Sequence, residues 1–155
     1  VTVKDGNVTL KKDRDYTVSY SANKGIGTAK VTVTGKGSYT GKITKTFKIN
    51  PQGQSISAKG DKSGKKIAVT LAKHSSNSGY QVSYADNSGF KNSKSLWLSG
   101  NSKNKGTIKG LKSKKTYYVK ARDYKTIGKT KVYGKWSAVK KVRAKNFPSR
   151  LTRLL

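Results

Sequence analysis

Apolar and polar residues alternate along almost the whole chain, and this two-residue period is the feature that most limits the possible folds. Successive side chains of a β-strand point to opposite faces of a sheet, so alternation of this kind indicates half-buried strands. No window sustains the 3.6-residue period of an amphipathic helix. The sequence therefore predicts an all-β fold.

The first fifty residues contain three alternating runs. The apolar residues of each run share one strand face: Tyr16, Val18 and Tyr20; then Ala29, Val31 and Val33; then Ile43, Phe47 and Ile49. Polar and glycine-rich connections at residues 21–27 and 35–41 separate the runs, as expected of turns. The sequence predicts three consecutive strands here.

Pro51 and Gly53 interrupt the alternation, because proline cannot donate to a sheet and glycine adds backbone freedom. We therefore expect one module at residues 1–51, a second at 52–145 and a tail at 146–155. The second module contains seven candidate strands, at residues 55–59, 65–71, 79–84, 95–99, 106–109, 117–124 and 138–144. Seven short strands separated by turns indicate a two-sheet sandwich.

The chain is strongly basic, with 35 Lys and Arg against six Asp and a net charge of +29. Such a surface attracts anions, and the candidate partners are anionic cell-wall polymers, acidic glycans, nucleic acid or an anionic membrane surface. Thirty of the basic residues are Lys. Lysine favours diffuse attraction over the bidentate phosphate contacts of arginine, which makes nucleic acid the less favoured partner.

Cysteine is absent, which excludes disulfides, thiolate nucleophiles and cysteine-ligated metals. No stretch approaches the roughly 20 apolar residues that span a bilayer, so we expect no membrane span. The chain opens at Val1 directly in a strand-like pattern, which indicates a fragment or a processed product.

Residues 1–50 resemble the bacterial Ig-like repeats of Gram-positive surface proteins. The resemblance lies in Val1-Thr-Val-Lys-Asp-Gly, in Leu10-Lys-Lys-Asp-Arg-Asp-Tyr-Thr-Val-Ser-Tyr, in Gly27-Thr-Ala-Lys-Val-Thr-Val-Thr-Gly and in Thr46-Phe-Lys-Ile. Such repeats normally begin with one or two further strands. A module without them is expected to expose a sheet edge and part of its core.

Residues 55–145 resemble a Lys-rich fibronectin type III module of clostridial-type surface proteins. The matching segments are Gly79-Tyr-Gln-Val-Ser-Tyr, Leu111-Lys-Ser-Lys-Lys-Thr-Tyr-Tyr-Val-Lys-Ala and Tyr133-Gly-Lys-Trp-Ser-Ala-Val-Lys-Lys-Val. The resemblance implies a tyrosine corner formed by Tyr117 with Leu111 as its packing partner. Leu71 stands where the family usually has a core Trp. Together the two resemblances imply two immunoglobulin-like β-sandwich modules in tandem.

These resemblances imply a non-catalytic module at the cell surface or in the cell wall of a Gram-positive bacterium. Its expected role is to space or tether neighbouring domains of a larger secreted protein, with electrostatic adhesion to an anionic wall polymer or glycan. Two alternatives stay open: a carbohydrate-binding adhesin that uses exposed aromatic rings, and a nucleic-acid-binding module.

The sequence offers little for catalysis, and we expect no enzyme, no cofactor and no metal site. Asp13 and Asp15 lie among basic residues and are interpreted as part of a solvated turn. His74 is the only imidazole, and one His without Cys or Glu can hardly build a metal site. Asp61 and Asp86 are interpreted as loop hydrogen-bonding residues, and Asp123 as a surface charge.

Aromatic residues are interleaved with lysine in the second module, a composition that can stack on sugar rings or bases while attracting phosphate. The alternative interpretation is that about half of these rings enter the core and the rest shield lysine stems. The candidate ligand-binding residues are Trp97, Tyr124, Tyr133 and Trp136.

Overall fold

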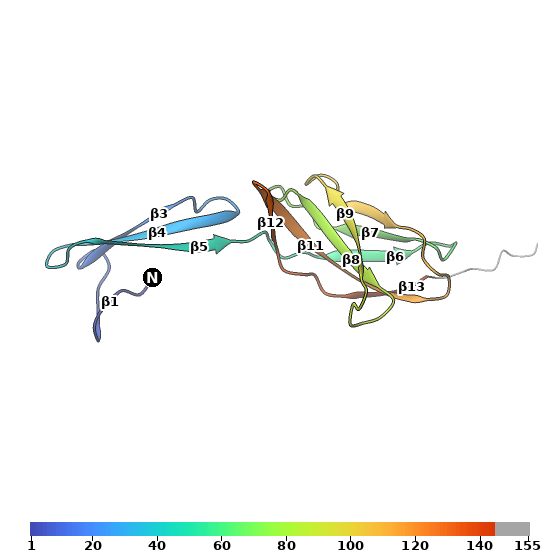
Figure 1. Ribbon diagram of the computed structural model, residues 1–155, viewed down its shortest axis with the longest axis horizontal. Coiled ribbons are helices and arrows are strands. Elements are labelled where there is room, and N and C mark those ends of the chain that lie inside the picture. The colour runs from blue at the N-terminus through green and yellow to red at the C-terminus, as the bar shows by residue number, and fades with distance from the viewer. Residues whose placement is uncertain (145–155) are drawn as a thin grey trace, which may run out of the picture. The chain divides into compact units, whose positions relative to one another are not determined.

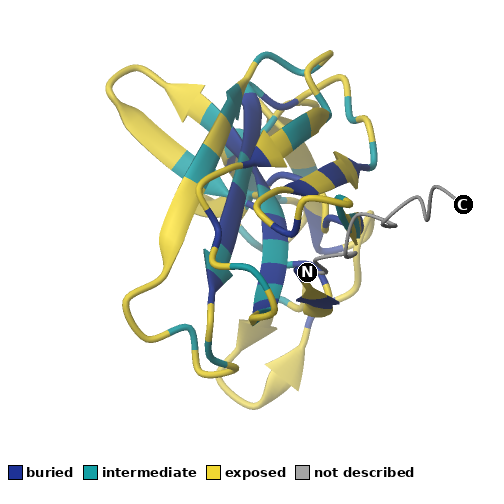
Figure 2. Cartoon of the chain, turned by 90° about the vertical axis from the view of Figure 1, so that its right-hand side faces the viewer, coloured by how far each residue is buried: buried dark blue, intermediate teal, exposed yellow. Residues whose placement is uncertain are grey.

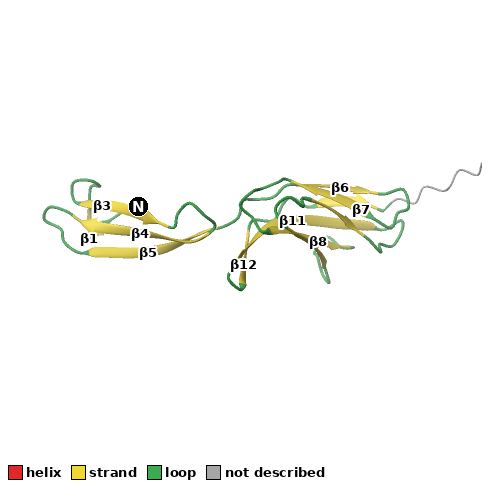
Figure 3. Cartoon of the chain, turned by 90° about the horizontal axis from the view of Figure 1, so that it is seen from above, coloured by secondary structure: helices red, strands yellow, loops and turns green. Residues whose placement is uncertain are grey.

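The computed structural model describes residues 1–144, which form antiparallel strands joined by turns and loops (Figure 3). This confirms the predicted all-β class. No helix able to cross a membrane occurs in the described range. By its internal contacts the chain divides into two compact units, Val1–Asn50 and Pro51–Leu155. The expected tail at residues 146–155 lies outside the described residues.

Unit 1 consists of a two-stranded hairpin and a three-stranded antiparallel sheet (Figure 1). The hairpin is β1 (Lys4–Asp5) and β2 (Val8–Thr9), and the sheet has the order β3 (Tyr16–Ser21), β4 (Gly27–Gly35) and β5 (Lys42–Ile49). The three alternating runs of the sequence therefore become three neighbouring strands in chain order.

One face of this sheet is apolar. The register pairs Val18 with Val33 and Val33 with Ile43, so the apolar residues of all three strands share that face. Leu10, Tyr16 and Ala29 are buried, whereas Ile43 is 59% exposed. The apolar face of unit 1 is thus only partly covered, in line with the expectation that part of this module's core is exposed.

Asp15 organises the loop that leads into β3. Its carboxylate accepts hydrogen bonds from the Arg14 guanidinium at 2.7 and 2.8 Å and from the backbone N–H of Lys11 at 2.8 Å. The Asp15 carbonyl accepts from the backbone N–H of Lys36 at 2.9 Å. The bonds from Arg14, followed by that from Lys11, lower the pKa of Asp15 to about 2. The carboxylate therefore stabilises the loop in its ionised form.

We predict that unit 1 loses stability in acid through Asp15. The pKa of Asp15 is about 2 in the folded chain, below the ordinary value of 3.8, so its contribution is complete above about pH 4 and disappears as the pH falls through 2. NMR amide signals of residues 10–36, followed from pH 5 to pH 2, measure this loss. Asp15→Asn should remove this pH dependence, and an unchanged acid transition in that variant would contradict the assignment.

Unit 2 is built from two antiparallel sheets (Figure 1). The smaller sheet has the order β10 (Lys105–Ile108), β7 (Ile67–Leu71) and β6 (Ile56–Gly60). The larger sheet has the order β12 (Thr130–Tyr133), β11 (Thr116–Ile127), β8 (Gly79–Ala85) and β9 (Lys94–Ser99), and β13 (Lys140–Arg143) also pairs with β11. β13 pairs with the first residues of β11 and β12 with its last residues, so two strands share one edge of β11.

The core of unit 2 lies between inward-facing residues of both sheets, and Figure 2 shows buried and exposed positions alternating along the strands. The most deeply buried apolar residues are Ile67, Val69, Tyr80, Val82, Ile108, Val119, Ala121 and Ala144. Leu71, at the position where the resembling family has Trp, is also buried in this core. The apolar positions of the alternating sequence therefore form the core.

The structure corrects the strand count of unit 2, because residues 51–144 contain eight strands where the sequence predicted seven. β11 continues to Ile127 and turns back through Gly128 into β12, which the sequence analysis missed. Gly128 has a φ of 58°, a conformation that glycine adopts without steric cost. The last strand, predicted at residues 138–144, is shorter, because only Lys140–Arg143 are paired.

We predict that Ile67→Ala destabilises unit 2 by about 2–5 kcal/mol, because Ile67 is fully buried and its loss leaves a cavity. Ile127→Ala is the matched control, since Ile127 is exposed, and should have a much smaller effect. Urea unfolding followed by tryptophan fluorescence measures the change, because Trp97 and Trp136, the two tryptophans of the chain, both lie in unit 2. Equal effects of the two substitutions would contradict this description of the core.

Candidate binding surface

The outer face of the larger sheet carries most of the aromatic and cationic candidates. Arg122 on β11 pairs with Gln81 on β8, which in turn pairs with Trp97 on β9. The Arg122 Nε atom donates to the Gln81 side-chain oxygen at 2.8 Å. The strand register thus brings residues distant in the sequence into one row across three strands.

Cations of β11 cover the aromatic rings that the sequence analysis singled out. The Arg122 guanidinium lies 3.7 Å from the Tyr133 ring centroid and 4.3 Å from that of Trp136. The Lys120 ammonium lies 4.8 Å from the Trp136 ring centroid and 4.0 Å from that of Phe90. Cation–π attraction of this kind stabilises both partners. Tyr133 and Trp136 therefore already stack on cations of the same unit.

Partial burial accompanies this stacking. Arg122 and Trp136 are half-buried, and burial lowers the pKa of Arg122 from its ordinary value. A sugar or base that stacked on the ring faces of Trp136 or Tyr133 would have to compete with Arg122 and Lys120. The arrangement favours a structural role for these two aromatic candidates.

Trp97 and Tyr124 form a second aromatic group on the same face. Their rings meet edge to face at 5.5 Å, and the Lys131 ammonium lies 5.1 Å from the Trp97 centroid. Trp97 is 43% exposed, but Tyr124 is only 5% exposed. A Cβ atom on Gly79 would approach the Tyr124 hydroxyl oxygen to 2.7 Å, so the missing side chain makes room for this ring. Trp97 is thus the candidate whose ring is most open to solvent.

Tyr117 and Leu111 lie at the start of β11 and in the loop before it. The Tyr117 hydroxyl accepts a hydrogen bond of 2.9 Å from the backbone N–H of Lys112, and both Tyr117 and Leu111 are buried. This is the contact that a tyrosine corner requires. It fixes the loop that connects the two sheets.

Asp123 is buried, so its interpretation as a surface charge was wrong. It has 0% exposure, and its carboxylate accepts hydrogen bonds from the Gln54 side-chain amide at 2.5 Å and from His74 Nδ1 at 2.7 Å. Gln54 also accepts from the backbone N–H groups of Ser55 and Ala72. The network therefore fixes the beginning of β6 to the end of β7 and to β11.

The sequence contained a signal for this burial. Asp123 has the same strand parity as Tyr117, Val119 and Ala121, which all face the core. Aspartate is usually exposed, and the interpretation as a surface charge followed this residue type and not the position in the strand. The network was missed because Gln54 and His74 lie 69 and 49 residues away in the chain, and sequence spacing does not show such contacts.

The remaining titratable candidates take part in hydrogen bonds of the loops, some of them with residues distant in the chain. Asp61 accepts from Ser63 and from the backbone of Lys66, and Asp86 contacts Lys115 at 3.1 Å, which confirms their interpretation as loop residues. His74 is held by Asp123. Within residues 1–144 there is no cluster of three or more His, Cys, Asp or Glu able to hold a metal ion.

Comparison with known proteins shows a likeness of fold. No protein-family model and no curated protein matches the sequence. The crystal structure of the chicken CNTN1 FN1–FN3 domains is similar, with a TM-score of 0.52 and 19% sequence identity over 79% of this chain and 45% of that one. The chain thus spans less than half of that structure. The likeness shows all-β tandem modules with structural similarity to fibronectin type III domains.

We predict that Asp123→Asn destabilises unit 2 by about 1–3 kcal/mol, because the amide has one acceptor oxygen in a buried place where the carboxylate accepts from both Gln54 and His74. Asp86→Asn is the matched control, since its contact with Lys115 is exposed, and should change stability within experimental error. Urea unfolding of both variants measures the difference, and a mild effect of Asp123→Asn would contradict the importance of the network.

Proposed function

We propose that the chain is a non-catalytic spacer of a Gram-positive cell-surface protein, which tethers neighbouring domains and adheres electrostatically to an anionic wall polymer or acidic glycan. The strongest support comes from unit 2, where the aromatic rings and the exposed lysines have different roles. Aromatic rings stack on internal cations, whereas lysines such as Lys59, Lys105 and Lys141 are exposed on the strands. Positively charged lysine side chains on several strands are therefore available to attract an anionic polymer.

The similarity to fibronectin type III domains supports the spacer role, because such modules typically carry no catalytic site. The excess of lysine over arginine supports adhesion without strict geometry, since an ammonium group acts as a point charge. A surface of this kind would hold a polymer through many weak contacts. Because wall polymers and glycans are found outside the cell, we propose that the protein is extracellular.

The partial exposure of Trp97 favours one second candidate function, stacking on a neutral sugar ring. This function makes a different prediction from electrostatic adhesion. Binding through Trp97 would survive high salt and would be lost in Trp97→Ala. Electrostatic adhesion would be lost in high salt and retained in that variant.

We predict that the whole chain binds a poly(glycerol phosphate) wall polymer in low salt and releases it as the salt concentration rises. If about four anionic groups are neutralised, a fourfold rise in salt lowers the affinity about 100-fold. A neutral glycan of similar length should not bind, and duplex DNA of similar charge tests the nucleic-acid alternative. Affinity measured by biolayer interferometry across a salt series separates these cases.

The charge of the lysines, and not their exact positions, should determine polymer affinity. Replacing Lys59, Lys62 and Lys141 by Gln should weaken polymer binding, and replacing the same residues by Arg should retain it. Salt-resistant binding of the polymer, or no binding in low salt, would overturn the proposed function. Preference for DNA over the wall polymer at equal salt would favour the nucleic-acid alternative.

A further inference from the structure

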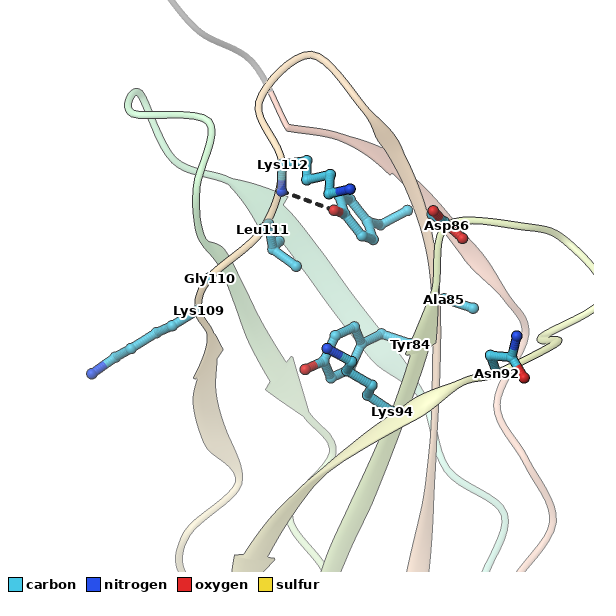
Figure 4. Close-up of a pocket in the computed structure, with 10 residues that line it drawn as sticks. Tyr84, Ala85, Asp86, Asn92, Lys94, Lys109, Gly110, Leu111 and Lys112 are labelled. Atoms are coloured by element: carbon cyan, nitrogen blue, oxygen red, sulfur yellow. Dashed lines mark hydrogen bonds between the residues drawn. The ribbon is translucent and has the colours of Figure 1, made fainter.

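A cavity of about 260 Å³ lies beside the tyrosine corner of unit 2 (Figure 4). Its walls come from β8 and the loop after it, from β9 and the loop before it, from the loop that follows β10, and from Tyr117 of β11. The residues used in the argument are Tyr84, Asp86, Asn92, Lys94, Lys109 and Lys112.

Positive charge dominates the cavity. Lys94, Lys109 and Lys112 line it, and Asp86 is the one carboxylate among its lining residues. Asp86 is already paired with Lys115, whose ammonium lies 3.1 Å from the carboxylate and lowers the pKa of Asp86. Lys115 offsets the charge of Asp86, and Lys94 and Lys112 add two positive charges at the cavity. An anionic group fits this environment better than a neutral or cationic one.

The backbone around the cavity is fixed before any ligand arrives. The Tyr117 hydroxyl holds the Lys112 N–H, and the Leu111 N–H donates to the carbonyl of Lys65 at 3.0 Å. On the opposite wall, the Asn87 side chain bonds both the N–H and the carbonyl of Lys91, each at 2.9 Å. A preformed site costs less ordering entropy when a ligand binds.

The cavity also offers groups suited to hydroxyls. The half-buried Tyr84 ring forms an apolar wall, and Asn92 carries an amide. In Figure 4 the Lys109 side chain extends away from the cavity, whereas Lys94 lies beside Tyr84. The volume is below the roughly 300 Å³ at which pockets for drug-sized ligands begin, so a single small unit fits.

We propose that this cavity binds one anionic sugar or polyol unit, with its phosphate or carboxylate between Lys94 and Lys112 and its hydroxyls toward Tyr84 and Asn92. The inference rests on the proposed function and deepens it. The diffuse lysine surface would gather an anionic polymer, and the cavity would select among its repeating units. Specificity would then come from one place on a surface that otherwise attracts any polyanion.

Binding of small monomers to the intact chain tests the site without the polymer. The probes are glucose 6-phosphate, glycerol 3-phosphate and glucuronate, with glucose as the neutral control. Two-dimensional amide NMR should show saturable shifts at residues 92–94 and 109–112 with the anionic probes only. Comparison of the phosphates with glucuronate tells which anionic group the site prefers.

Paired lysine variants separate the site from general charge. Lys94→Gln with Lys112→Gln should lower the monomer affinity at least about tenfold, which corresponds to about 1.4 kcal/mol. Lys105→Gln with Lys129→Gln removes the same charge from exposed positions at the far end of β10 and in the β11–β12 turn. This control should keep the monomer affinity within about twofold of the original. The tryptophan fluorescence of all variants verifies that unit 2 remains folded.

Each outcome decides the proposal. Equal loss in the two double variants, shifts spread over all exposed lysines, or no saturable monomer binding would overturn the cavity as a site. Salt-sensitive polymer binding would persist in those cases, and the proposed function would stand without the site. If the chain bound the anionic monomers at the cavity but did not bind the polymer in low salt, only the proposed adhesive function would be overturned.

Discussion

The pairing of β11 is the constraint on which the rest of unit 2 depends. This strand bonds β8 along one edge and both β12 and β13 along the other. Its alternating side chains supply Tyr117, Val119 and Ala121 to the core, and Lys120 and Arg122 to the outer face. A shift of one residue in its register would exchange these two sets and bury the cations. The core, the tyrosine corner and the aromatic stack therefore all require a single register.

A net charge of +29 opposes compaction, and the structure shows how the fold tolerates it. Arg122 and Lys120 lie against ring faces, where the attraction of a cation for a π system replaces an ion pair. The scarce carboxylates serve local structure: Asp15 and Asp61 hold turns, and Asp123 holds a buried network. Among the described residues, Lys12 and Lys115 are the only lysines within ion-pair distance of a carboxylate, and this excess of lysine charge is the physical basis of the proposed polyanionic partner.

The sequence predicted those features that follow from local periodicity. The fold class and the three strands of unit 1 depend only on which residues alternate. The extension of β11 into β12 was missed, although Gly128 between two alternating runs indicated a hairpin. The Gln54–Asp123–His74 network and the lysine cavity could not be predicted, because each joins residues that are distant in the chain. Sheet register decides such contacts, and periodicity alone does not specify register between distant strands.

Unit 2 has no cysteine, so directional hydrogen bonds, and not disulfides, fix its connections. Hydrophobic burial is not directional and by itself does not position a loop. Near the beginning of β11, Tyr117 holds the Lys112 backbone, and six residues later Asp123 holds Gln54 and His74. The first of these contacts also forms part of the proposed anion cavity. The same hydrogen bond that stabilises the module would therefore position the proposed binding loop, so that the site would be rigid without any additional structural element.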